Sequence, residues 1–232
     1  MADRLFSGFF SDFFSMVGVT DSIRVTLVMS FWSVLISSVL GVLLGLLLQR
    51  AQFAGKRIVV RLNRTLMAAP PVVIGLFSYM LLRNKGPLGM LEWVFTIQGM
   101  VFAQVLIITP LICGLIHSYA ERIAPAVYAF AKTMGATERQ TRWLLLREMK
   151  NEVYFAVVTG YGRSISEVGA VFLIGGNIKN STRTMTTTIS TLKSAGDFEA
   201  GIFLGVLLMI MAFIIQCLAD HFRKEDTPDE DD

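Results

Sequence analysis

Long apolar runs separated by short polar segments dominate the pattern of this 232-residue chain. A run of about 18 or more apolar residues is long enough to cross a bilayer as a helix. Five segments reach that length, and they cover residues 25–48, 65–82, 93–116, 153–176 and 200–219. The pattern therefore predicts an all-α membrane protein with about five transmembrane helices.

The polar segments divide the chain into three regions. Residues 1–24 carry phenylalanines at helical spacing, which is typical of a helix lying in the membrane interface. Residues 25–220 form the predicted transmembrane domain, which includes a polar insert at residues 121–152. Residues 221–232 form an acidic tail, for which the composition predicts no packed structure.

The distribution of basic residues predicts the orientation. Thirteen of the 21 Lys and Arg residues follow the first, third and fifth predicted spans, and seven lie in the other polar segments. Because Lys and Arg accumulate in short cytoplasmic segments, we expect the insert and the C-terminus in the cytoplasm and the N-terminus outside. The chain is thus expected to be a multi-pass membrane protein. The same rule explains the basic segment at residues 49–64 without nucleic-acid binding.

Composition and motifs argue against an enzyme. The chain is 53% hydrophobic and 17% charged, and it contains no H-E-x-x-H motif, no G-x-S-x-G nucleophile elbow and no G-x-x-x-x-G-K-[ST] phosphate loop. We expect no catalytic residue, no metal and no cofactor on this chain, so any ATP-driven work needs another subunit. Cys113 and Cys217 lie in apolar runs and are predicted to be buried.

Prolines interrupt two of the predicted spans. Pro70 and Pro71 lie near the start of the second span, and Pro110 lies within the third. A proline removes a backbone donor and kinks or breaks the helix. Such a break survives in a membrane only where protein or a water-filled cavity covers the freed carbonyls. Pro70 and Pro71 are therefore candidates for a transport path.

The insert at residues 121–152 is the longest polar interruption. Helical patterns run up to Met134 and resume after Thr137, which is suited to cap the second helix, and Gly135 separates them. The sequence thus predicts a helix–turn–helix platform on one membrane face, built to contact a partner. Six of its residues are basic: Arg122, Lys132, Arg139, Arg142, Arg147 and Lys150.

One pair of charges lies inside a predicted span. Arg163 and Glu167 are four residues apart, which places them on one face of a helix. Intramembrane charges need partners or water, so the pair either locks helix packing or forms a polar patch on a path with Ser164 and Ser166. The threonine-rich segment at 177–197 has two interpretations as well, a hydrophilic loop with capping hydroxyls or a set of anion ligands.

The insert resembles a family signature. Ala131, Gly135 and Leu145 match the last Ala, the Gly and the Ile position of the cytoplasmic loop of bacterial ABC importer permeases, which reads EAA, three residues, Gly, nine residues, Ile, any residue, Leu-Pro. Ala129 replaces the Glu, Phe130 replaces an Ala, and Arg147-Glu148 replace Leu-Pro. The resemblance implies a coupling helix that docks on an ATPase, with these contact residues: Ala131, Lys132, Met134, Gly135, Ala136, Arg139 and Leu145.

Further segments are similar to the oxyanion importers for molybdate and tungstate. They include Ala-Pro-Pro-Val-Val-Ile-Gly at 69–75, Ser-Glu-Val-Gly-Ala at 166–170 and Gly-Gly-Asn-Ile at 175–178. The last two, with the Arg-Glu ending of the loop, resemble the tungstate permeases most. The resemblance implies a homodimer of permeases, two ABC ATPases that bind ATP, and an external binding protein that delivers the oxyanion.

Two other functions are compatible with the residues. In the first, the chain has the same role but the cargo is molybdate, or less favourably sulfate, as decided by the external binding protein. A channel or ion-coupled carrier without an ATPase is the second alternative, because five spans and one charge pair permit it. That alternative leaves the basic platform at 121–152 without a purpose.

Overall fold

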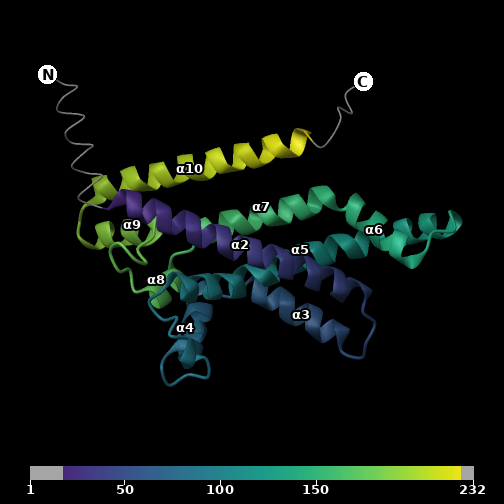
Figure 1. Cartoon of the computed structure of the whole chain (residues 1–232), viewed down its shortest axis with the longest axis horizontal. Coiled ribbons are helices and arrows are strands. Elements are labelled where there is room, and N and C mark those ends of the chain that lie inside the picture. The colour runs from purple at the N-terminus through teal and green to yellow at the C-terminus, as the bar shows by residue number, and fades with distance from the viewer. Residues whose placement is uncertain (1–17, 226–232) are drawn as a thin grey trace.

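The computed structural model describes residues 18–225, and in this range the chain is helical with no strand (Figure 1). The predicted all-α class is therefore confirmed. The prediction of an interfacial helix at residues 1–24 concerns mostly residues outside the described range. The elements in chain order are α2 (Val19–Arg50), α3 (Lys56–Met67), α4 (Pro71–Leu82), the 3-10 turn η1 (Gly89–Leu91), α5 (Ile97–Thr133), α6 (Glu138–Glu148), α7 (Lys150–Ser166), α8 (Gly169–Gly175), α9 (Met185–Ser194) and α10 (Phe198–Glu225).

The predicted spans correspond to these helices in three different ways. Within the described residues, α2, α5 and the Phe198–Leu218 part of α10 are each long and apolar enough to cross a membrane. The second predicted span is broken, because α3 and α4 meet at an angle of 103°. The fourth is divided between α7 and the short α8. Helix α2 begins at Val19, so residues 19–24 belong to the first span rather than to the N-terminal segment.

Helices α2 and α5 form the centre of the molecule, where they lie side by side (Figure 1). Gly41 and Gly45 of α2 permit this approach, since a Cβ atom at Gly41 would lie 2.7 Å from the Cβ of Ile112. The small-residue pair on α2 thus acts as a helix-packing surface. Helix α7 packs against both, and the core cluster continues from the membrane helices into the insert through Ala120, Ala124, Leu145 and Met149.

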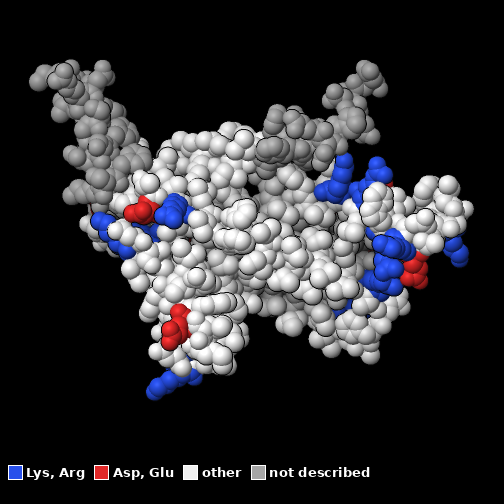
Figure 2. Space-filling model, in the orientation of Figure 1, with Lys and Arg blue, Asp and Glu red and all other residues white. Residues whose placement is uncertain are grey.

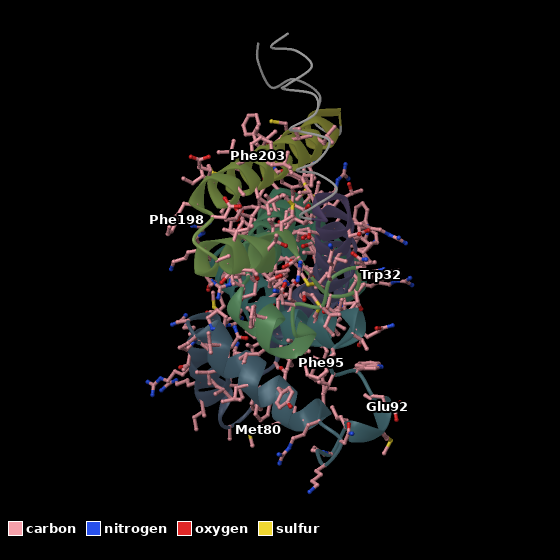
Figure 3. The ribbon with its side chains drawn as sticks, turned by 90° about the vertical axis from the view of Figure 1, so that its left-hand side faces the viewer. Trp32, Met80, Glu92, Phe95, Phe198 and Phe203 are labelled. Atoms are coloured by element: carbon pink, nitrogen blue, oxygen red, sulfur yellow. The ribbon has the colours of Figure 1, made fainter. Side chains whose placement is uncertain are left out.

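Helices α4 and α10 lie at opposite edges of this centre. In Figure 3, Met80 and Glu92 mark the end that projects beside α4, whereas Phe198 and Phe203 of α10 lie at the other end. Helix α10 packs mainly on α9 and leaves most of its apolar surface exposed. Cys217 lies on this exposed surface, so the prediction that it is buried is wrong, whereas Cys113 is buried in α5. A terminal helix packed along one side contributes few core positions.

Charged side chains gather at the two ends of the molecule. Figure 2 shows a cluster of Lys and Arg at the end formed by α6, a smaller charged group at the opposite end, and an uncharged band between them on this face. An uncharged band bordered by charges is the arrangement that a bilayer requires. The long axes of α2, α5 and α7 run across this band (Figure 1).

Candidate functional site

The polar insert forms the predicted helix–turn–helix. Helix α5 ends at Thr133, and Gly135 then adopts a left-handed φ of 67°. No atom lies within 4 Å of a Cβ atom built on Gly135, so backbone conformation alone favours glycine there. Thr137 begins α6 with a capping box, in which its Oγ1 accepts from the amide of Gln140 and the Gln140 side chain accepts from the amide of Thr137.

The seven residues predicted to contact an ATPase divide into two groups. Ala131 and Leu145 are buried, and Leu145 packs in the same core cluster as Ala120 and Met149. These two side chains pack within the platform, and their contact with an ATPase stays a prediction. The remaining members are exposed or half-exposed: Lys132, Met134, Gly135, Ala136 and Arg139.

Exposed aromatic side chains complete this surface. Phe130 is 59% exposed and Trp143 is 62% exposed, on the two sides of the turn. The guanidinium of Arg147 lies 5.4 Å from the centre of the Trp143 ring. Neither aromatic residue was among the contacts that the family resemblance implied, and their exposure adds them to the candidate contacts. We call the exposed set Phe130, Lys132, Met134, Arg139, Arg142 and Trp143 the docking surface.

The docking surface is tied to the end of the first span. Arg50, the last residue of α2, pairs with Glu138 at the start of α6, with 3.3 Å between Nη2 and Oε2. Beside this pair is a cavity of about 460 Å³, also lined by Tyr128, Lys132 and Gly135. Both charged partners are largely solvent-exposed, so the pair guides orientation more than it adds stability.

The intramembrane charge pair lies at a helix break. Nη2 of Arg163 is 3.9 Å from Oε2 of Glu167, so the two residues pair as their spacing predicts. Helix α7 ends at Ser166, however, and Glu167 lies in the link to α8. Its Oε1 accepts a hydrogen bond of 3.2 Å from the amide of Ala170, and its backbone carbonyl accepts one from Thr186. The prediction of one continuous helix there is wrong, because these hydrogen bonds satisfy the backbone at the break.

The two candidate serines occupy different environments. Ser166 is exposed at the end of α7. Ser164 is fully buried, and its hydroxyl donates to Oε1 of Gln104 at 2.5 Å and lies 3.0 Å from Oγ of Ser33. Gln104 also donates to the backbone carbonyl of Ser164 at 2.9 Å. This network joins α2, α5 and α7, so Ser164 serves helix packing in this conformation.

Gln104 offers a test of that role. Replacing Gln104 by Leu removes an acceptor and a donor from the buried network, and interhelical hydrogen bonds of this kind are worth about 1–2 kcal/mol. We expect the thermal midpoint of the purified chain in detergent to fall by about 2–4 °C per kcal/mol lost. Gln98→Leu is the control, since Gln98 is exposed on the same helix. An unchanged midpoint in the Gln104 variant would contradict the packing role.

The second half of the threonine-rich segment forms helix α9, whereas residues 177–184 form turns. Thr184 caps α9 in a second capping box, and Thr186, Thr187 and Thr188 are buried. Oγ1 of Thr26 on α2 accepts from the amide of Met185 at 3.0 Å, and Ser22 contacts Thr188 at 3.1 Å. The hydroxyls therefore satisfy one another and the neighbouring backbone, in agreement with the capping interpretation. The expectation of a hydrophilic loop is corrected for residues 185–194, because they form a helix whose first turn is buried.

The proline break places α4 beside α8. Pro71 begins α4 and Pro70 precedes it with extended backbone, where a helix tolerates proline. A Cβ atom at Gly75 would lie 2.6 Å from the Cα of Ala170, so the two helices touch through their backbones. Among the predicted path residues here, Pro70 and Ser166 are exposed, and Pro71 and Arg163 are partly exposed. Of the six predicted path residues, Ser164 and Glu167 are enclosed.

Comparison with known proteins identifies the family. The family described as "Binding-protein-dependent transport system inner membrane component" matches residues 37–225. The chain belongs to this family. It is therefore a membrane-spanning transport subunit of an ABC importer, and ATP hydrolysis takes place on a separate subunit.

Individual relatives and solved structures are similar to this chain over most of its length. The chain is 36% identical over 190 residues to the tungstate uptake system permease protein TupB of Peptoclostridium acidaminophilum, which covers 82% of this chain and 83% of TupB. It is 33% identical over 204 residues to a probable anion ABC transporter permease protein of Haloferax volcanii, covering 86% and 88%. Among solved structures, an inward-facing MetNI methionine ABC transporter chain shares the fold, with a TM-score of 0.69, 18% identity and coverage of 93% and 98%.

Proposed function

We propose that this chain is the permease of an ATP-driven tungstate importer. The observation that carries the proposal is the 36% identity to a tungstate uptake permease over four-fifths of the chain. The motifs at 166–170 and 175–178 support it, because they resemble those of the tungstate permeases. In the structure they form the break after α7 and the turn after α8. The cargo is the proposed part, because membership of the family establishes only the role in transport.

Two copies of the chain are proposed to enclose the path. The break between α3 and α4 leaves Ala69 and Pro70 at the surface of one copy, within the part of the chain that crosses the membrane. Lipid cannot satisfy exposed backbone carbonyls, so a second copy or a water-filled path must cover the break. Arg163 and Ser166 lie near the same break, and Pro70 and Pro71 are its proposed bending point.

The partners follow the two charged ends of the molecule. Two ABC ATPase subunits are proposed to bind the docking surface on the cytoplasmic side. An external binding protein is proposed to deliver the oxyanion to residues 83–92 and to the region around α9. This region lies at the end of the molecule opposite α6 (Figure 1). The N-terminus is then outside and the C-terminus inside. ATP-driven movement of the docking surface rocks the helices around the α3–α4 bend.

Metal uptake tests the cargo. Cells with and without this chain are given trace tungstate together with excess molybdate, and cellular tungsten and molybdenum are measured by elemental analysis. We expect tungsten accumulation to depend on the chain and to survive the molybdate excess. Chain-dependent accumulation of molybdenum instead would assign molybdate as the cargo, and a loss of sulfur uptake would assign sulfate. Uptake that persists when the ATPase is absent would favour a channel or carrier.

A further inference from the structure

Helix α3 has three distinct faces. Asn63 and Met67 pack on α5, where Nδ2 of Asn63 donates to the carbonyl of Pro110 at 3.2 Å. A second face is exposed and apolar, with Ile58, Val59, Leu62 and Leu66. The third face is exposed and basic, with Arg57, Arg61 and Arg64 at i, i+4 and i+7. We call these three residues the arginine face.

The arginine face is uncompensated. Helix α3 contains no acidic residue, and none of the three arginines forms an ion pair with a described residue. The neighbouring Lys56 is different, because its Nζ lies 3.6 Å from Oε1 of Glu121 on α5. Glu121 is thus the acidic residue that pairs with α3 among the described residues, and it does so through Lys56.

The position of α3 along α5 fixes the depth of these charges. Nζ of Lys56 reaches Glu121, and Nδ2 of Asn63 reaches the carbonyl of Pro110, so α3 runs beside this stretch of α5. The 11-residue step from Pro110 to Glu121 corresponds to about 16 Å of helix, and the stretch of α5 before Glu121 contains no Lys, Arg, Asp or Glu. Since the hydrocarbon core is about 30 Å thick, Arg61 and Arg64 extend from the cytoplasmic edge toward its middle. This corrects the placement of the whole segment 49–64 in the cytoplasm, because α3 forms one half of the bent second span.

Charges at this depth do not face lipid without cost. Intramembrane arginines face a bundle interior or a water-filled cavity, and they mark ion paths. On α3 the apolar face with Ile58 and Leu62 is suited to lipid, and it lies well apart from the arginine face around the helix. Anion-selective pores use arginine and lysine for the same reason, that positive charge lowers the energy of an anion in a narrow path.

We propose that the arginine face of α3 lines the cytoplasmic half of the transport path and draws the oxyanion toward the exit. This inference rests on the proposed function and adds the segment that carries the anion beyond the α3–α4 bend. Three separate side chains along about two turns provide successive weak sites rather than one tight site. A doubly charged oxyanion would then move from one to the next and leave.

Thiol labelling tests the exposure of this face to water. Arg61→Cys and its neighbour Leu62→Cys are made in a Cys217→Ser background, because Cys217 is exposed, and the assembled transporter is studied in open membrane fragments with both faces accessible. We expect a water-soluble anionic methanethiosulfonate to modify Arg61→Cys at least about tenfold faster than Leu62→Cys, since a thiol in lipid does not ionise. Equal and slow rates at both positions would show that the arginine face lies against lipid, and would overturn the proposal.

Transport measurements separate this inference from the choice of cargo. Arg61→Gln is expected to lower tungstate uptake about tenfold while ATPase binding is unchanged, and Arg61→Lys should retain most of the uptake because it keeps the charge. If molybdate is the cargo, the labelling contrast persists and the loss appears in molybdate uptake instead. Normal uptake of both anions by Arg61→Gln and by the triple Gln variant of the arginine face would contradict the proposal.

Discussion

Replacing Trp143 by alanine is expected to weaken binding of the ATPase subunit about 30-fold. Trp143 is the largest exposed side chain of the docking surface, and it is flanked by Arg139, Arg142 and Arg147. Tryptophan and arginine dominate the energetics of protein interfaces, and removal of a central tryptophan costs about 2 kcal/mol or more. At 1.4 kcal/mol for each factor of ten, that cost corresponds to the expected change in affinity.

Co-purification and titration of the ATPase against the permease in detergent measure this effect. Trp32→Ala is the matched control, because Trp32 is 50% exposed on α2 and lines a pocket with Trp93 and Phe95 rather than lying on the insert. Arg139→Glu with Arg142→Glu should weaken binding further by reversing two charges of the surface, and chain-dependent uptake should fall with it. Unchanged affinity in both variants would place the ATPase contact elsewhere.

Replacing Glu167 by leucine is expected to abolish most uptake while the assembled complex persists. Its Oε1 holds the amide of Ala170 at the start of α8, and its Oε2 pairs with Arg163. Loss of a capping acceptor costs about 1 kcal/mol. About a third of the Arg163 side chain is exposed. Losing its ion pair with Glu167 therefore costs less free energy than losing a fully buried pair. The total is too small to unfold the chain but large enough to release the α7–α8 break.

Glu167→Leu and Glu167→Gln distinguish geometry from charge. The Gln variant keeps an oxygen for the Ala170 amide, so we expect it to retain the helix break and a substantial part of the uptake, whereas the Leu variant loses uptake by about tenfold or more. Glu199→Leu is the control, because Glu199 is exposed at the start of α10. Assembly is monitored by size-exclusion chromatography with the ATPase. Full uptake by Glu167→Leu would show that the break does not depend on this carboxylate.

Much of the fold was predictable because apolar length is a local property. The runs at 25–48, 93–116 and 200–219 became single long helices, since in a membrane the backbone satisfies its hydrogen bonds within each helix. The turn at Gly135 was also predictable, because a glycine between two helical patterns, followed by Thr137, specifies the left-handed residue and the cap locally. The docking platform thus followed from sequence alone.

The sequence by itself determined the helical class, the platform and the family. Only the tertiary structure decided which side chains of each motif face outward. Ala131 and Leu145 match the family signature yet are buried, and Ser164 points into a network with Ser33 and Gln104, residues distant in sequence. It also decided that α7 ends at Ser166 and that the threonines form a buried helix. The physical reason is that burial and hydrogen-bond partners at these positions come from other helices, which the local pattern of apolar and polar residues does not specify.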